Sequence, residues 1–399
     1  NFYEKNGFQK DSVDVMYKFF VHIFRICTNF LIYCAYLDFL HKNRDNLFMT
    51  KLPFNFNFDD VEILKALNNA NHKLGQLNGA INLLPNPYVI FNAITLGEAK
   101  ESSEIENIVT TFDEIFKEMT YSKSNPASKE VLNYRQAMLT GFNLLKENGF
   151  ISKNHIIQIH HIVESEVGDL RKLPGTVIMN TKTGEVLHTP PQNQEEIEEY
   201  LSNLEKYINI PELQDIDPIL KMAVIHFQFE SIHPFYDGNG RTGRMLNILY
   251  LTLAKKIDLP ILYLSKYINQ NRSKYYECLN EVQGDINKLK SYLMFMIEGV
   301  YQMSEFTLKF IDSFMKTMNQ ASELVKERCP KFYSQELIDH LFFDFYTKNE
   351  FLCKKLSITR NTASKYLHEL TAAGLLIEEK IGKSKIFKNA FLYNLIKLW

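Results

Sequence analysis

The sequence predicts a mainly helical protein with one β-hairpin in its middle and a smaller mixed domain of helices and strands at its carboxy-terminal end. Apolar residues recur at three- and four-residue steps over most of the chain, which is the spacing of one buried helix face. The spacing changes at residues 176–189 and again after residue 374, where short β-prone runs flank turns that contain glycine. These changes of period locate the hairpin and the second domain.

The composition is that of a soluble globular protein with more than one domain. Hydrophobic residues make up 45% and charged residues 23% of the 399 residues, so we expect two or three domains. A net charge of -2 argues against a chain that binds nucleic acid or membranes over its whole surface. The five cysteines are odd in number and lack metal-ligand spacing, which indicates reduced thiols and a cytoplasmic location.

Residues 1–48 differ from the rest of the chain. The stretch 19–40 is strongly apolar and aromatic, but His22, Arg25 and Asn29 interrupt it. A central arginine alone costs roughly 2.5–3.5 kcal/mol on membrane insertion, and no small-residue cleavage site follows. We therefore expect residues 1–48 to be a non-essential and non-native extension, such as an upstream read-through. A peripheral membrane anchor is the alternative.

The helices are expected in a regular series after this extension. The first begins at Asp59 or Asp60, either of which can cap it, and it ends at the two prolines of 83–88. Two short runs, 176–179 and 185–189, surround a turn at Gly184 and predict a hairpin that lies on the helices. Apolar spacing predicts further helices at 89–98, 104–120, 127–147, 153–165, 195–208, 217–231, 240–256, 272–281 and 285–325.

The last part of the chain has the element order of a winged helix-turn-helix module. We expect helices at 334–346, 350–356 and 360–373, a turn at 357–359, and then two strands around a Gly-Lys-Ser turn. The predicted domains are thus the extension at 1–48, an amino-terminal helical segment at 49–130, a core at 131–325 and a winged helix-turn-helix domain at 330–399.

The run HPFYDGNGRTGR at 233–244 has the composition of a phosphate site between two apolar helices. Gly238, Asn239 and Gly240 precede the second helix, so backbone N–H groups at its positive end form a candidate anion cradle. Arg241 and Arg244 are one helical turn apart and can hold further phosphate oxygens. An additional carboxylate, Asp237, is a hard oxygen ligand that suits Mg²⁺, and His233 can take a proton from a hydroxyl.

The same run resembles the signature of the Fic family, His-x-Phe-x-(Asp/Glu)-Gly-Asn-Gly-Arg-x-x-Arg, at every defined position. The resemblance implies a Fic-type helical core in which the hairpin is a flap. It implies a protein adenylyltransferase that transfers AMP from ATP to a Ser, Thr or Tyr hydroxyl of a target protein. His233 would be the base, Asp237 would hold Mg²⁺, and Asn239 with the glycine amides would support the α-phosphate. Gly240 stands where phosphorylating members have lysine, which favours AMP transfer.

Many Fic proteins carry an inhibitory helix with the pattern (Ser/Thr)-x-x-x-Glu-(Gly/Asn). Ser102, Glu106 and Asn107 match this pattern upstream of the main motif. The resemblance implies that the Glu106 carboxylate pairs with Arg244 and occupies the space of the ATP γ-phosphate. The alternative is that Glu106 is one more solvated residue on a charged helix face.

Two further sets of residues follow from the resemblance. The flap would add a target peptide to its edge as a strand, and the alternative is a purely structural hairpin. The residues expected to dock the target are Thr176, Val177, Ile178 and Met179. Contacts around the adenosine are expected from Asn269, Tyr275 and Tyr276, with core packing as the alternative for the two tyrosines.

The carboxy-terminal module is locally basic, with nine Lys or Arg against three acids between residues 351 and 399. It resembles the winged-helix modules of prokaryotic regulators, which implies contact with a DNA backbone. A protein-interaction or dimerisation unit is the alternative. The residues expected to face DNA are Arg360, Asn361, Lys365, Lys383 and Lys385.

We therefore expect an autoinhibited AMP transferase that uses ATP and Mg²⁺, modifies itself and a target protein, forms a homodimer and has no membrane partner. The first alternative is a DNA-binding transcriptional regulator whose Fic core senses nucleotides. The others are a Fic enzyme that uses another nucleotide donor, or one that removes AMP with Glu106 orienting a water.

Overall fold

The computed structural model describes residues 49–121, 125–165, 169–179, 184, 186–343, 345–381 and 384–398. The chain divides into two units, Asn1–Thr50 and Lys51–Trp399, and the described helices and strands all belong to the second. The extension predicted for residues 1–48 lies outside the described residues, so its role stays a prediction. None of the described helices is both long and apolar enough to cross a membrane.

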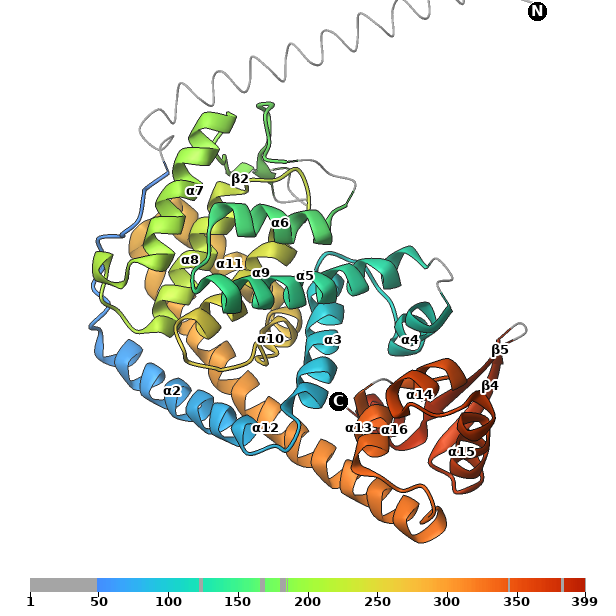
Figure 1. Ribbon diagram of the computed structural model, residues 1–399. Coiled ribbons are helices and arrows are strands. Elements are labelled where there is room, and N and C mark those ends of the chain that lie inside the picture. Colours follow the sequence, from blue (N-terminus) through green and yellow to red (C-terminus); the bar gives the residue numbers. More distant parts are fainter. Residues whose placement is uncertain are drawn as a thin grey trace, which may run out of the picture. The chain divides into compact units, whose positions relative to one another are not determined.

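Helix α2 (Val61–Asn82) lies along the 40-residue helix α12 (Leu289–Arg328) (Figure 1). The Asp60 side chain accepts hydrogen bonds from the backbone N–H groups of Glu62 and Ile63, so the predicted cap is confirmed. The recurring apolar side chains of α2 are buried, as their spacing predicts. The two helices are therefore held together mainly by apolar contacts of the buried face of α2.

Helices α3 (Pro87–Ile105) and α4 (Phe112–Tyr121) correct the predicted helices at 89–98 and 104–120. Helix α3 continues past residue 98 to Ile105. The prediction ended it too early because the buried face becomes polar from residue 98 on, so the apolar spacing stops although the helix continues. It ends where Asn107 adopts a left-handed conformation with φ of 65°. A new helix then starts at α4, where the Thr111 hydroxyl accepts a hydrogen bond from the N–H of Glu114.

The core surrounds helix α8 (Pro218–Ile232), which is buried along nearly its whole length and packs on α7, α9 and α12. Most core helices start and end within a few residues of their predicted bounds. Helix α10 was not predicted, because its seven residues are too few to display helical spacing. The remaining core elements are α5 (Pro126–Asn148), α6 (Lys153–Val163), α7 (Gln194–Asn209), η3 (Pro211–Leu213), α9 (Asn239–Leu253), α10 (Leu264–Gln270), α11 (Arg272–Gly284) and η4 (Ile286–Lys288).

The predicted hairpin is confirmed as a two-stranded antiparallel sheet of β1 (Ile178–Met179) and β2 (Val186–His188). Ile178 pairs with His188 and Met179 with Val186, with a register irregularity between the two pairs. The strands are shorter than the predicted runs, and most of the connection between them lies outside the described residues. Among the described residues this sheet has no third strand, so β1 keeps an outer edge.

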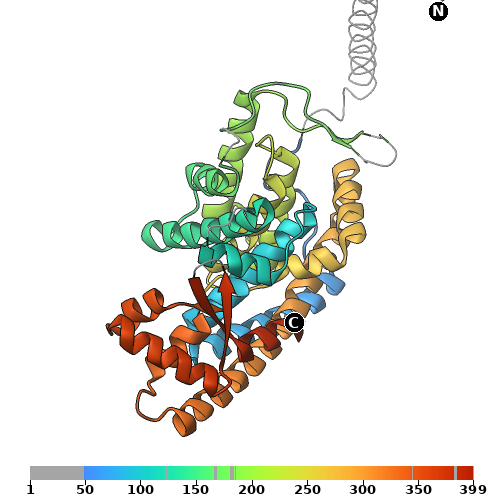
Figure 2. The ribbon, with the colours of Figure 1, turned by 90° about the vertical axis from the view of Figure 1, so that its right-hand side faces the viewer.

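The carboxy-terminal domain has the predicted order of helix, helix, helix and two-stranded hairpin (Figures 1 and 2). A short additional strand, β3, joins this hairpin to give one antiparallel sheet in the order β3-β5-β4. The helix expected at 334–346 is therefore too long, since Tyr346 pairs with Lys388 in the sheet. The elements are α13 (Gln335–Phe343), β3 (Tyr346–Thr347), α14 (Asn349–Leu356), α15 (Arg360–Ala372), β4 (Leu376–Ile381), β5 (Ser384–Asn389) and α16 (Ala390–Leu398).

We predict that Gly141→Val lowers the free energy of unfolding by roughly 1–3 kcal/mol, because overpacking displaces core side chains. A Cβ atom at Gly141 would lie 2.7 Å from the Leu249 Cδ1 atom and 2.9 Å from the Ile159 Cδ1 atom, where α5 meets α9 and α6. The measurement is the thermal denaturation midpoint, with Gly79→Val in α2 as the matched control because nothing lies within 4 Å of its Cβ position. Equal midpoints for the two variants would contradict this packing.

Candidate active site

The turn that carries His233 is held in an unusual backbone conformation by Arg171. His233 ends α8 with φ of 46° and ψ of 58°, in the left-handed region that a residue with a side chain rarely adopts. The Arg171 Nε atom donates to the His233 carbonyl at 2.6 Å, and its Nη2 atom donates to Ile232 and Pro191. The backbone N–H of Arg171 also donates to the Pro234 carbonyl. Sequence reasoning missed Arg171, because it lies in a segment without helical or strand spacing.

The His233 imidazole is set to be neutral. Burial, with the nearby charge of Arg171 as a further cause, lowers the pKa of His233 to about 4. Its Nδ1 atom is buried and has no hydrogen-bond partner among the described residues. A neutral imidazole at physiological pH is the form that accepts a proton, so the predicted base has the required protonation state.

The loop after His233 is closed by Phe235 and Asn239. The Phe235 ring is buried and stacks on the His160 ring, with ring centroids 3.6 Å apart and an interplanar angle of 3°. The Asn239 Oδ1 atom accepts from the Phe235 N–H at 2.9 Å, and its Nδ2 atom donates to the Phe235 carbonyl at 2.8 Å. The Asn239 side chain therefore holds the loop, and its predicted support of the α-phosphate stays a prediction.

The glycines of the predicted cradle lie where a side chain would not fit. Gly238 caps α9 in the left-handed conformation, and a Cβ atom there would lie 2.7 Å from the Glu164 Cγ atom. A Cβ atom at Gly240 would lie 2.3 Å from the Glu106 Oε1 atom and 2.8 Å from the Arg244 Nη1 atom. The first-turn N–H groups of α9 lack partners within the helix, which suits an anion, while the N–H of Gly238 donates to the Asp237 Oδ1 atom at 2.6 Å. The anion cradle stays a prediction.

Arg244 is buried and is held by the two residues of the predicted brake. Its Nη2 atom pairs with the Glu106 Oε1 atom at 2.7 Å, and its Nε atom donates to the Ser102 hydroxyl at 2.9 Å. Nη2 also donates to the Ser102 carbonyl at 2.9 Å. Burial of Glu106 opposes ionisation, but the charge of Arg244 prevails and lowers the pKa of Glu106 below its ordinary value. The structure therefore brings Arg244 together with Ser102 and Glu106, which lie more than a hundred positions earlier in the sequence.

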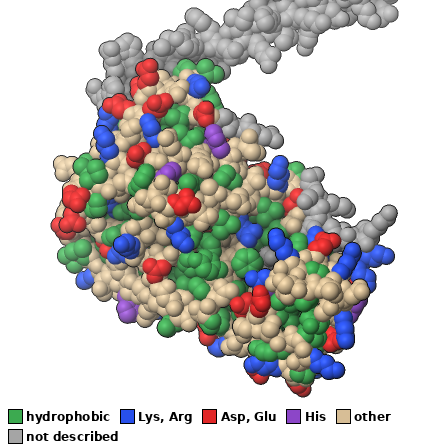
Figure 3. All heavy atoms as spheres, in the orientation of Figure 1, with side chains coloured by type: hydrophobic (Ala, Val, Ile, Leu, Met, Phe, Trp, Pro, Cys, Tyr) green, Lys and Arg blue, Asp and Glu red, His purple; other side chains and the backbone are tan. Residues whose placement is uncertain are grey.

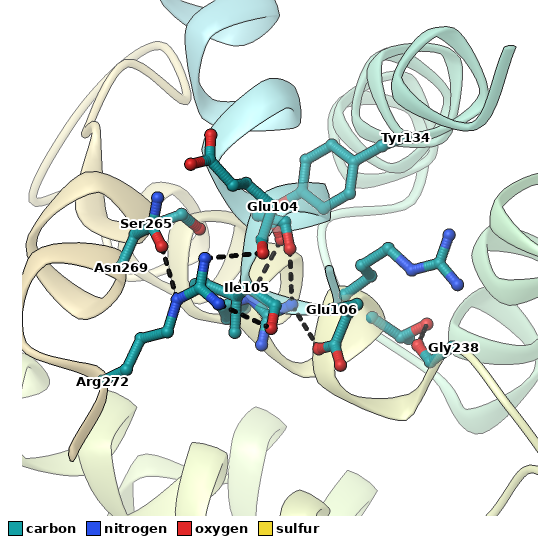
Figure 4. A network of polar contacts seen from close by, with 12 residues as sticks. Glu104, Ile105, Glu106, Tyr134, Gly238, Ser265, Asn269 and Arg272 are labelled. Carbon is teal, nitrogen blue, oxygen red and sulfur yellow. Dashed lines mark hydrogen bonds and ion pairs between the residues drawn. The ribbon is translucent and has the colours of Figure 1, made fainter. Parts of the chain in front are cut away.

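The end of α3 beside Glu106 is capped by Arg272, which the sequence reading missed (Figure 4). Its Nη2 atom donates to the Glu104 carbonyl at 2.6 Å and its Nη1 atom to the Ile105 carbonyl at 3.5 Å. The Nε atom of Arg272 donates to the Asn269 Oδ1 atom at 2.6 Å. A cation at a helix carboxy terminus satisfies free carbonyl groups and the helix dipole. Asn269, predicted to contact adenosine, therefore also orients the residue that holds the brake helix.

One turn before Ser102, Glu98 ties α3 to the start of α10. It is 1% exposed, and it accepts hydrogen bonds from the backbone N–H of Ser265 at 2.9 Å and from the Ser265 hydroxyl. The Tyr134 hydroxyl donates to the same carboxylate at 3.4 Å. Burial raises the pKa of Glu98 to about 7. Glu98, Ser102 and Glu106 thus form a polar stripe along one face of α3.

The two tyrosines predicted near the adenosine have different surroundings. Tyr275 is 1% exposed, and its hydroxyl lies 2.7 Å from the Nε2 atom of His226, so it belongs to the core. Tyr276 is 43% exposed, with its ring centroid 5.1 Å from that of Tyr275. The structure therefore assigns packing to Tyr275 and leaves Tyr276 and Asn269 as candidates for adenosine contact.

Arg241 and Asp237 complete the site. Arg241 is buried and pairs with Glu130 at 2.9 Å and with Glu164, whereas Arg244 pairs with Glu106, so the phosphate-binding role of Arg241 stays a prediction. The Asp237 carboxylate is largely exposed and lies 4.0 Å from the Arg241 Nη2 atom. An exposed carboxylate beside an anion cradle fits a hard divalent cation bound together with phosphates.

The flap is joined to the active-site turn. The His188 Nε2 atom in β2 lies 2.8 Å from the Ser231 carbonyl, two residues before His233. The Gln192 Nε2 atom donates to the Thr176 carbonyl at 2.9 Å, and Val177 follows Thr176 just before β1. Met179 at the end of β1 is 52% exposed. Of the four predicted docking residues, Ile178 and Met179 form β1 and only Met179 is exposed, so their docking role stays a prediction.

Three protein-family descriptions match the chain and agree with this geometry. The amino-terminal Fic/DOC model matches residues 64–143 and the Fic/DOC family model matches residues 150–251. A third, described as the carboxy-terminal domain of SoFic-like protein adenylyltransferase, matches residues 317–392. This chain belongs to the Fic family. The Fic protein thus has its motif on the α8–α9 turn and the residues of its predicted brake at the end of α3.

Its similarity to curated relatives is limited to part of each chain. Protein adenylyltransferase Fic of Culex quinquefasciatus is 29% identical over 173 residues, which are 43% of this Fic protein and 33% of the relative. Protein adenylyltransferase fic-1 of Caenorhabditis elegans is 29% identical over 153 residues, which are 38% and 28% of the two chains. The matched region thus spans about a third of these relatives' length.

Solved structures show the same fold at lower identity. A Fic family protein from Desulfovibrio desulfuricans G20 matches with a TM-score of 0.50 and 16% identity, over 82% of this chain and 96% of that chain. A fragment of Fic-1 from C. elegans, residues 134–508, matches with a TM-score of 0.50 and 21% identity, over 64% and 74%. Both matches support the Fic fold found here.

We predict that His233 does not titrate between pH 8 and pH 5.5 in the folded protein. Its pKa of about 4 lies below the ordinary value near 6.5, so the neutral imidazole becomes protonated only at a lower pH than a free histidine does. The measurement is an NMR titration of ¹³C-histidine-labelled protein, with His233→Ala to assign the signal and the urea-unfolded chain as control. A midpoint near 6.5 in the folded state would contradict the buried, neutral imidazole.

Proposed function

We propose that this Fic protein is an autoinhibited adenylyltransferase that transfers AMP from ATP to a Ser, Thr or Tyr hydroxyl of a target protein and of itself. The neutral His233 imidazole beside the amino-terminal end of α9 is the observation that carries the proposal. The names of the curated relatives support the same reaction class.

The proposed chemistry divides between the base and the cradle. His233 accepts the hydroxyl proton as the hydroxyl oxygen forms a bond to the α-phosphorus, and the bond from that phosphorus to the bridging oxygen breaks to release pyrophosphate. The N–H groups at Gly238 to Gly240 stabilise the charge on the α-phosphate. When bound, Mg²⁺ held by Asp237 supplies charge neutralisation on the phosphates.

The proposed brake follows from competition for Arg244. The Glu106 carboxylate lies 2.7 Å from the Arg244 guanidinium, which would otherwise grip the terminal phosphate. Because Gly240 has no side chain, Glu106 reaches the start of α9 itself. ATP therefore binds in a non-productive pose until Glu106 leaves.

Docking of the target peptide along the outer edge of β1 belongs to the same proposal. Backbone hydrogen bonds to an added strand would place the acceptor hydroxyl near His233, since β2 is tied to the last turn of α8. A cytoplasmic location and a homodimer stay predictions.

We predict that Glu106→Gly increases self-labelling by α-labelled ATP with Mg²⁺ about 10- to 100-fold, the range expected for loss of one charged hydrogen bond. His233→Ala in the same background should abolish labelling, because the proposed base is lost. Glu104→Gln is the matched control, since its carboxylate pairs with Lys100 and not with Arg244.

The nucleotide donor is tested in the same assay. Labelling by CTP, GTP or UTP in place of ATP would assign another donor to this site. A Glu106→Gly protein that shows no self-labelling with any of the four nucleotides would contradict the transferase proposal. If the unmutated protein removes label from a modified target and the Glu106→Gly protein does not, the result would instead favour AMP removal.

A second function, DNA binding by the carboxy-terminal domain, is favoured by the exposure of α15. Arg360, Asn361 and Lys365 are exposed on this helix, and Figure 3 shows Lys and Arg side chains on the visible face of the domain. The predicted wing contributes less, because Lys385 pairs with Glu378 at 2.7 Å. Lys383 lies outside the described residues.

We predict that the double substitution Arg360→Ala and Lys365→Ala weakens binding to random duplex DNA at low salt. It should also reduce the slope of log affinity against log salt by roughly 0.9 for each lost phosphate contact. Fluorescence anisotropy measures both, with Lys316→Ala in α12 as the control that removes an exposed lysine outside this domain. No binding by the unmutated protein at low salt would refute this function.

A further inference from the structure

The helices on both sides of Glu106 contact the carboxy-terminal domain. Helix α3 leads into Glu106 and packs on α13, while α4 follows it after a short connection and packs on β3. The predicted roles of these helices do not require contact with the carboxy-terminal domain, because the predicted brake involves only the pairing of Glu106 with Arg244.

The contact with α3 is polar and buried. The Asn92 Nδ2 atom donates to the Phe343 carbonyl at the end of α13, and the Asn92 Oδ1 atom accepts from Arg135. Nearer the start of the helix, the Asn86 Nδ2 atom donates to the Asp339 carboxylate at 3.1 Å. The Asn92 amide is 6% exposed, so separation of the two parts would leave buried polar groups without partners.

The contact with α4 combines ring stacking with a hydrogen bond. The Phe116 and Phe345 rings are stacked, with centroids 3.8 Å apart and an interplanar angle of 22°. The Tyr346 hydroxyl donates to the Asp113 Oδ1 atom at 2.9 Å. Phe116, Phe345 and Tyr346 are each 2–3% exposed. Burial raises the pKa of Tyr346, so its hydroxyl stays a donor to the Asp113 carboxylate.

The connection between Glu106 and α4 is short and is itself tied down. The N–H of Asn107 donates to the Glu104 carbonyl at 2.9 Å, and the N–H of Ile108 donates to the Ser103 carbonyl at 3.1 Å. The Thr110 hydroxyl lies 2.9 Å from the Ser128 hydroxyl at the start of α5. A displacement of α4 would strain these bonds, so the positions of α4 and Glu106 are coupled.

We propose that the carboxy-terminal domain is the control element of the brake: by holding α3 and α4, it sets how firmly Glu106 occupies Arg244. This inference rests on the proposed autoinhibition. The contacts of Phe345 and Tyr346 stabilise the arrangement in which Glu106 is in place, and a contact that stabilises one of two arrangements shifts the population toward it. A partner that binds the domain and weakens these contacts would release the enzyme.

The test removes one hydroxyl from this contact. Tyr346→Phe keeps the ring but loses the hydrogen bond to Asp113, and we expect self-labelling by α-labelled ATP to rise about two- to tenfold, the range of one hydrogen bond. In a Glu106→Gly background the same substitution should have no effect, because there is no brake left to loosen. Tyr333→Phe is the matched control, since it removes a hydroxyl that lies 3.0 Å from the Ser322 hydroxyl of α12 and forms no hydrogen bond to Asp113.

Two results would overturn the proposal in this assay: an unchanged rate for Tyr346→Phe, or an equal rise in the Glu106→Gly background. Failure of the proposed function is distinguishable, because Glu106→Gly would then be inert by itself.

Hydrogen exchange gives a readout that does not depend on activity. Amides of residues 106–121 should exchange several-fold faster in Tyr346→Phe than in the unmutated protein or in Tyr333→Phe. Unchanged exchange over this segment would also overturn the proposal. Far-UV circular dichroism of each variant verifies that the fold is retained.

Discussion

The buried ion pair between Arg244 and Glu106 is the interaction on which the rest of the site depends. A buried guanidinium without an anion leaves several kcal/mol of desolvation uncompensated, so this position needs a negative partner at all times. The protein supplies one from α3, and a nucleotide phosphate would supply one from solution. Under the proposed function, inhibition and substrate binding are therefore two ways of satisfying the same cation, and the site cannot do both fully at once.

Other groups in the site fix the positions of the Glu106 carboxylate and of the His233 turn. Glu98 and Arg272 fix α3 along its length and at its end, so the Glu106 carboxylate reaches Arg244 from a rigid helix and not from a loose loop. On the opposite side, Arg171 holds the His233 turn through backbone carbonyls alone. The predicted base and the predicted brake are thus positioned by separate supports.

The sequence predicted those features that local patterns encode, including the motif turn, most helices, the hairpin and the brake pair. It failed where a side chain acts on the backbone of a distant segment. Arg171 and Arg272 each bind carbonyl groups, which carry no residue signature, and Asn239 turns back onto its own loop. The true end of α3 was missed because Glu98 and Ser102 are buried polar residues, and apolar spacing cannot detect a polar interior face.

The stack of Phe116 on Phe345 has a consequence for the modularity of the chain. These rings fill the boundary between a helix of the amino-terminal segment and the first strand of the tail, and both are almost fully buried. A chain without the tail would expose the Phe116 ring and the Asn92 amide to water at the base of α3 and α4. The amino-terminal segment and the tail are therefore packed against each other in this protein, and a change in either ring alters the surface that the other ring needs.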